Sequence, residues 1–202
     1  MHEIALYLLQ MILPGCLGAL LWGITRPYRR YRREKRGLSP GSAREGALLL
    51  FFILTTGLLA LTLTPVDFWS DVLIFHRLPE APRFSLERVN LTPMRETWKQ
   101  YRYYARRGIW SFLLINFLGN IVMFMPNGFF TALLVDRPRW WKSALATLGL
   151  SLFIEVFQLF VSRGTDVDDL ILNTLGGLCG YWVFLLFRCV NPGLVRRCAK
   201  SK

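Results

Sequence analysis

The stretch SLFIEVFQLFVSRGTDVDDLILNTLGGLCG, residues 151–180, joins two apolar runs through a short acidic turn. In the first run, Glu155 and Gln158 are three residues apart, so they would share one face of a helix. The second run carries polar side chains at positions i, i+3 and i+7, which are Asp166, Asp169 and Asn173. If both runs are membrane helices, these two polar faces meet at one end of a helical hairpin. Because acidic residues are costly to place inside a membrane, their presence there indicates a functional site.

Apolar runs long enough to cross a membrane occur five times in this chain. A crossing needs about 20 predominantly apolar residues, and hydrophobic residues make up 53% of the 202 residues. The core of a soluble helical protein would account for one or two such runs, but not for five. We therefore predict an all-α, polytopic integral membrane protein with transmembrane helices at residues 4–24, 46–64, 111–135, 143–162 and 170–187. These helices would form a single membrane domain over residues 1–202, with an extracellular segment at residues 65–108.

The net charge of +12 is carried mainly between the apolar runs. Seven Lys and Arg residues lie between positions 26 and 36, directly after the first run. Such a cluster is typical of the cytoplasmic side of a membrane protein, and no basic folded domain surrounds it, which argues against nucleic acid as a partner. The extracellular segment is basic as well, so the predicted orientation depends on this densest cluster. We expect the N-terminus outside and the C-terminus inside (N-out/C-in), with a loop from the cluster to residue 44.

The end of the extracellular segment, MRETWKQYRYYARR at residues 94–107, has the pattern of an amphipathic helix. Trp98, Tyr101 and Tyr104 follow one another at three-residue spacing and would lie near one face. Two interpretations remain open. The helix would either lie at the headgroup level, where aromatic rings are favoured, or form a cap packed on the protein without touching lipid.

The third apolar run contains a second polar pattern, NFLGNIVMFMPNG, at residues 116–128. Asn116 and Asn120 are four residues apart and would share a helical face. Pro126 lacks a backbone N–H and is expected to bend the helix. In the predicted orientation both asparagines lie in the outer half of the membrane, at the level of Glu155. They would either contribute to a site with Glu155 or serve only as hydrogen-bonding contacts between helices.

The four cysteines show no ligand spacing, so we expect free thiols and no disulfide framework. His2 and His76 are isolated in the sequence, and no Ser–His arrangement supports nucleophilic catalysis. We expect neither a cofactor nor a metal ion. A cation held by hard oxygen ligands, such as Mg²⁺ or Ca²⁺, is the alternative, with ligands from Glu155, Asp166, Asp168 and Asp169.

The order and spacing of these motifs resemble those of the VanZ-like family. That pattern consists of N-x-x-x-N-x-x-x-F-x-P-x-G, then E-x-x-Q, R-x-x-D-x-x-D and N-x-x-G. Its positions here are Asn116, Asn120, Phe124, Pro126, Gly128, Glu155, Gln158, Arg163, Asp166, Asp169, Asn173 and Gly176. The element Asn90-Leu91-Thr92-Pro93 also resembles a segment that precedes those spans in the family, and the likeness extends over about residues 46–187.

The resemblance implies a multi-pass protein of the bacterial plasma membrane. Because the family is named for a protein linked to teicoplanin resistance, it also implies a contribution to glycopeptide resistance at the outer leaflet of the cell envelope. It does not imply a particular reaction. Expected partners are membrane lipids and either a lipid-linked cell-wall precursor or a lipoglycopeptide.

Three hypotheses for the polar residues follow. In the first, the protein binds or moves an envelope lipid, precursor or lipoglycopeptide through the amides and charged groups Asn116, Asn120, Gln158, Arg163 and Asn173. In the second, it is a membrane-embedded hydrolase or transferase in which Glu155 is the general base and the second carboxylate comes from Asp166 or Asp169. In the third, Glu155 and Arg163 form an internal ion pair, while Asp166 or Asp168 caps the last helix.

Overall fold

The computed structural model of the chain describes residues 2–35, 37–38, 41–64, 89–90, 92–108, 110–160 and 165–199. This part of the chain contains seven helices and one pair of two-residue strands. The helices are α1 (His2–Glu34), α2 (Ser42–Leu63), α4 (Arg95–Arg106), α5 (Trp110–Leu134), α6 (Trp140–Gln158), α7 (Val167–Val190) and α8 (Pro192–Cys198). The strands are β1 (Val89–Asn90) and β2 (Thr165–Asp166). The predicted all-α class is confirmed.

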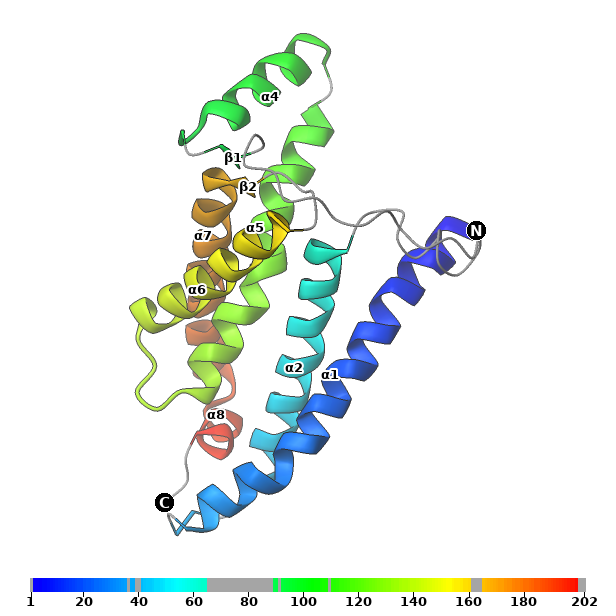
Figure 1. Cartoon of the computed structure of the whole chain (residues 1–202). Helices are drawn as coiled ribbons and strands as arrows, with labels where there is room; N and C mark the ends of the chain where they lie inside the picture. The colour runs from blue at the N-terminus through cyan, green and yellow to red at the C-terminus, as the bar shows by residue number, and fades with distance from the viewer. Residues whose placement is uncertain are drawn as a thin grey trace.

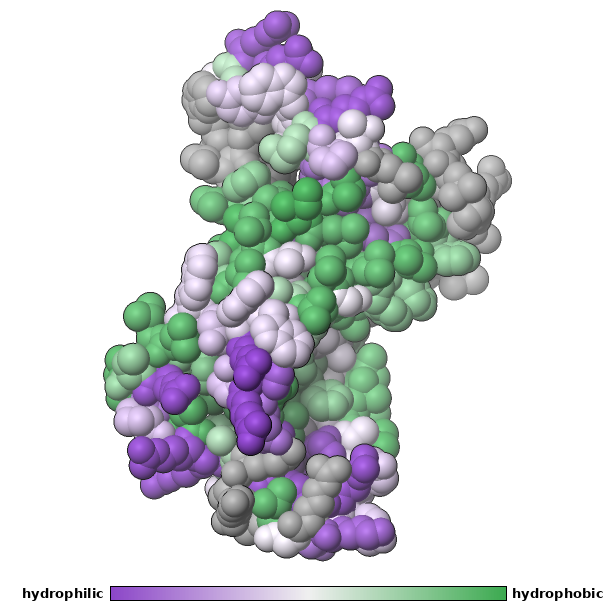
Figure 2. All heavy atoms as spheres, turned by 90° about the vertical axis from the view of Figure 1, so that its left-hand side faces the viewer, coloured by the Kyte–Doolittle hydropathy of each residue, from purple (hydrophilic) through white to green (hydrophobic). Residues whose placement is uncertain are grey.

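The long helices form a bundle whose two ends differ (Figure 1). The α1–α2 connection, α8 and the C-terminus lie at one end, whereas α4 and the strand pair lie at the other. Figure 2 shows hydrophobic residues over much of the middle of one face, with hydrophilic residues at its top and over its lower part.

Within the described residues, three helices are long and apolar enough to cross a membrane. They are α2, the part of α5 from Phe117 to Leu134, and α7. This agrees with a membrane protein. The five-span count and the N-out/C-in orientation stay predictions.

The basic cluster after the first predicted span belongs to a helix and not to a loop. α1 continues to Glu34, because Arg and Lys have high helix propensity. The helix is terminated after Glu34 by Gly37, which has a φ of 66°, a left-handed conformation that glycine adopts without steric cost. The N–H of Leu38 donates to the carbonyl of Arg33 at 3.0 Å, the hydrogen bond typical of a Schellman C-cap. The loop predicted from the basic cluster to residue 44 is therefore shorter, because most of the cluster belongs to α1.

Glycine residues allow α7 to lie directly against α5. A Cβ added to Gly180 would collide with the carbonyl oxygen of Met125, and one added to Gly128 would collide with the backbone of Gly177. The close approach of the two helices positions the first turn of α7 beside the upper half of α5. α5 itself continues through Pro126.

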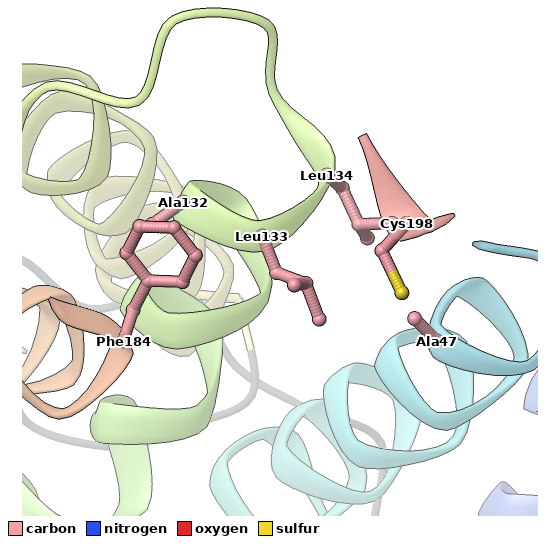
Figure 3. Close-up of a cluster of buried hydrophobic side chains, with 6 residues drawn as sticks. All are labelled: Ala47, Ala132, Leu133, Leu134, Phe184 and Cys198. Atoms are coloured by element: carbon pink, nitrogen blue, oxygen red, sulfur yellow. The ribbon is translucent and has the colours of Figure 1, made fainter. Parts of the chain in front are cut away.

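Two apolar clusters hold the remaining helices around this pair. Figure 3 shows the larger one, which joins α2, α5, α7 and α8 through Ala47, Ala132, Leu133, Leu134, Phe184 and Cys198. The smaller one joins α2, α5 and α6 through Leu58, Phe124 and Ile154. Glu155, the next residue on α6, is buried as well.

The strand pair links two segments that are far apart in the chain. β1 and β2 are parallel, with Val89 opposite Thr165 and Asn90 opposite Asp166. The sequence did not predict these strands, because two residues are too few to show an alternating pattern. The pairing brings the segment that leads into α4 onto the acidic turn. α4 itself confirms the helix predicted within residues 94–107.

Candidate functional site

The acidic residues gather where α6 ends and α7 begins, at the α4 end of the bundle. Glu155 lies one turn before the end of α6 and is only 2% exposed. Its Oε2 accepts a hydrogen bond from the Asp166 N–H at 3.1 Å, and its backbone carbonyl accepts one from Thr165 Oγ1 at 3.1 Å. The helix end and strand β2 are therefore joined at Glu155.

Asp166 has a structural role in this arrangement. Its Oδ1 accepts hydrogen bonds from the Asp168 N–H at 3.0 Å and from Asn90 Nδ2 at 3.0 Å. The first bond makes Asp166 the N-cap of α7, as predicted for this residue or Asp168, since N-terminal N–H groups of a helix need acceptors. The second bond holds β1 in place.

Asp168 anchors α4. Its side chain is buried, at 3% exposure, and its Oδ2 accepts hydrogen bonds from Thr97 Oγ1 at 2.6 Å and from the Thr97 N–H at 3.4 Å. Its Oδ1 accepts a third from the Met94 N–H. Asp168 thus caps the N-terminus of a helix other than its own. No sequence pattern predicted this contact, because the partners lie more than 70 positions apart in the chain.

Asp169 meets one of the two asparagines predicted to bind substrate. Asn120 Nδ2 donates to Asp169 Oδ1 at 2.8 Å, so the shared level predicted for α5 and the acids is confirmed for this pair. The carboxylate of Asp169 is also close enough to that of Glu155 for their charges to repel.

The remaining predicted site residues do not all join this group. Gln158 Nε2 donates to the carbonyl of Thr62 at 3.1 Å and so ties α6 to α2. Asn173 lies one turn below Asp169 on α7, where its Nδ2 donates to Ser151 Oγ at 2.8 Å. Arg163 and the side chain of Asn116 lie outside the described residues, so the predicted Glu155–Arg163 ion pair does too.

Three acceptor atoms in this region have no hydrogen-bond donor among the described residues. Asn173 is 4% exposed, and its buried Oδ1 has no partner there. Glu155 Oε1 and Asp169 Oδ2 likewise accept nothing from the described part of the chain. Asp169 and Asn173 are four residues apart and share a face of α7. Among the described residues, the site therefore offers more acceptors than donors.

The described residues leave two acids of the site without a helix-capping role. Over the described ranges, no three His, Cys, Asp or Glu residues are grouped as a metal ion would require, so the structure adds no support to the cation alternative. Two of the four acids are already occupied by helix caps. What is left is a pair of carboxylates, Glu155 and Asp169, flanked by the amides of Asn120 and Asn173.

Comparison with known proteins gives one match. A family model described as VanZ/LLP1 matches residues 51–188, which include every residue of the site. Neither the curated proteins nor the solved structures contain a match to the chain.

Proposed function

The chain belongs to the VanZ/LLP1 family, and from this premise we propose that it is a multi-pass protein of the bacterial plasma membrane which binds the head of a lipid-linked envelope molecule. The ligand is rich in hydroxyl or ammonium groups and carries a lipid tail. A lipid-linked cell-wall precursor and a lipoglycopeptide such as teicoplanin both fit this description. Binding one of them would be the contribution of this protein to glycopeptide resistance.

The observation that carries the proposal is the buried Asn173 Oδ1, which has no hydrogen-bond partner among the described residues. Beside it, the second carboxylate oxygens of Glu155 and Asp169 accept nothing from the described part of the chain, although they are not buried atoms. A buried acceptor without a donor costs about 1–3 kcal/mol, and more when it is charged. A ligand that supplies hydroxyl or ammonium donors would recover this free energy on binding. Sugar hydroxyls suit the Asn120–Asp169 pair, since an amide and a carboxylate together offer donors and acceptors to one hydroxyl-bearing ring.

A lipid tail is proposed because the site lies beside apolar helices. α2, the described part of α5, and α7 are each suited to a membrane, and the site sits where α5, α6 and α7 meet. A ligand anchored by its own tail would approach the head site from within the bilayer. This favours lipid-linked molecules over soluble ones.

The proposed topology is five spans in an N-out/C-in arrangement. Its support is that the basic part of α1 and the α8 end lie at one end of the bundle, and the site lies at the other (Figure 1). With the basic end in the cytoplasm, the site would face the outer leaflet, where envelope precursors and glycopeptides are present.

An enzyme is the second candidate, and the neighbouring carboxylates favour it. Glu155 and Asp169 interact electrostatically, as the two acids of a general acid–base pair do. Such an enzyme would be a hydrolase or transferase acting on a lipid-linked substrate. Asp166 is the weaker choice for the second carboxylate, because one of its oxygens already caps α7 and holds Asn90.

Native mass spectrometry separates the two candidates. Detergent-purified wild type and Glu155→Gln would each be incubated with teicoplanin or with lipid-linked cell-wall precursor. We expect an adduct of unchanged ligand mass on wild type that is reduced at least tenfold on the variant. A product of altered mass formed by wild type alone would replace the binding proposal with the enzyme. Equal ligand binding by wild type and Glu155→Gln would contradict the proposal that Glu155 belongs to a binding site.

A further inference from the structure

The outward face of α4 is basic and belongs to no part of the site described above. Four cations and one tyrosine line a hollow of about 430 Å³ on this face, formed by Lys99, Arg102, Tyr103, Arg106 and Arg107. Their positions follow the spacing i, i+3, i+4, i+7 and i+8, so they form one continuous stripe. The volume lies within the range of about 300–1,000 Å³ that small-molecule sites span.

The side chains of this basic hollow are held in part by one another. The guanidinium of Arg107 lies over the ring of Tyr103, 3.8 Å from its centroid, and also donates to the Tyr103 hydroxyl. Such a cation–π contact orients the guanidinium. A planar, oriented guanidinium is suited to bind the oxygens of a phosphate.

Exposed aromatic residues flank the basic hollow. Trp98 and Tyr101 are 54% and 42% exposed, and their rings stack at 5.3 Å between centroids. Aromatic rings of this kind are favoured at the level of lipid headgroups, where one edge is wet and the other apolar. A surface that combines exposed aromatic rings with a cationic stripe is typical of helices that lie on anionic membranes.

The chain places this face near the membrane boundary. Three residues separate Arg106, where α4 ends, from Trp110, where α5 begins, so the two helix ends lie within about 14 Å of each other even if the connection is extended. The predicted span of α5 starts at residue 111. The headgroup layer beyond the hydrocarbon core is about 5–7 Å thick on each side. If the span begins at residue 111 as predicted, the long side chains of Arg106 and Arg107 are within reach of lipid phosphates.

We propose that the basic hollow of α4 binds the phosphate of an anionic phospholipid in the leaflet at this end of the bundle. The charge complementarity of four cations to a phosphodiester carries the inference. α4 does not need the lipid in order to be positioned, because Asp168 anchors its N-terminus. Of the two interpretations of residues 94–107, we therefore favour the helix at the headgroup level, with its N-terminus also fixed to the protein by Asp168.

Hydrogen–deuterium exchange of the α4 peptides, measured in lipid nanodiscs, tests whether the basic hollow binds an anionic phospholipid. Wild type would be compared in discs of phosphatidylcholine alone and in discs containing phosphatidylglycerol. We expect slower exchange over residues 95–107 in the anionic discs, by at least threefold. The double variant Arg102→Gln/Arg106→Gln should lose this difference, whereas Arg196→Gln/Arg197→Gln, with the same charge change at the other end, should keep it.

Two results would overturn the proposal. The first is equal exchange of α4 in both lipid compositions. The second is protection of α4 that appears only when lipid-linked cell-wall precursor is added, which would assign the basic hollow to the precursor's phosphates instead. Neither result depends on Glu155, so the proposed function stands or falls separately.

Discussion

Glu155 and Asp168 are both almost fully buried, yet their carboxylates differ in what they contact. Both oxygens of Asp168 accept hydrogen bonds from the start of α4, so its charge is satisfied within the protein. Glu155 uses Oε2 for the Asp166 N–H, and its other oxygen has no donor among the described residues. Asp168 therefore has a structural role, whereas Glu155 is the acid that we propose to bind a ligand.

The role of Asp168 leads to a prediction about stability. Asp168→Asn removes the charge that caps α4 and one of its acceptor oxygens. Hydrogen bonds to charged groups contribute about 1.5–3 kcal/mol, so we expect the apparent thermal midpoint to fall by about 4–10 °C. Limited proteolysis should then cut near α4. The matched control Glu34→Gln, at the exposed end of α1, should change neither; a D168N protein with intact α4 would contradict the anchoring role.

The sequence predicted the candidate site better for contacts within one helix or turn than for contacts between segments that are far apart in the chain. The predicted level of Asn120 agrees with its hydrogen bond to Asp169, and the position of Asp166 before the last apolar run agrees with its role as N-cap of α7. The spacing that put Asp166 on a helical face was wrong, because α7 begins only at Val167. The spacing did not predict that Gln158 donates to the Thr62 carbonyl on α2, because spacing specifies a helical face but not the neighbour that the face meets. The Asp168–Thr97 contact was beyond any local pattern, since it depends on β1 pairing with β2.

At the scale of elements, the α5–α7 contact determines where the acids lie. The two helices approach closely enough that glycine has no substitute at several positions of the interface. The membrane offers no hydrophobic driving force between helices, so such close packing contributes strongly to their association. The sequence showed the glycines, and the structure shows which helix they face.

The close contact predicts a sharp difference between two Gly→Ala substitutions. Gly180→Ala would push its methyl group into the backbone carbonyl of Met125, and overpacking of this kind costs about 1–3 kcal/mol. Gly149→Ala on α6 meets no atom within 4 Å and should be neutral or stabilising by up to about 1 kcal/mol. Thermal unfolding of both variants in the same detergent checks this. Equal thermal midpoints of the two variants would show that the close α5–α7 contact does not contribute to stability.

The element predicted least well was the first helix. Its apolar part was recognised, but α1 extends beyond it into the basic cluster. Hydropathy marks the membrane boundary, whereas helix propensity and the glycine at position 37 decide where the helix ends. The two boundaries need not coincide.

At the scale of the whole molecule, the proposed function requires that the site face the outside of the cell. In a variant whose native cysteines are replaced by serine, Gln100→Cys on α4 should react with a membrane-impermeant maleimide on intact cells. Arg139→Cys, in the connection between α5 and α6, should react only after the cells are permeabilised. We expect at least a tenfold difference in labelling between the two positions on intact cells. The reverse pattern would contradict the N-out/C-in orientation and place the site in the cytoplasm.

The central claim is that Glu155 and Asp169 bind a ligand and do not merely stabilise the fold, and calorimetric titration of teicoplanin into purified protein tests it most directly. Wild type, Glu155→Gln, Asp169→Asn and the control Glu34→Gln would be compared, with thermal midpoints measured on the same samples. Glutamine at position 155 keeps an acceptor for the Asp166 N–H and removes the repulsion between the two acids. We therefore predict an unchanged or slightly higher midpoint together with a Kd raised about tenfold or more, the loss expected for a charged hydrogen bond. An unchanged Kd with a lowered midpoint in both site variants would contradict the claim and make these acids structural.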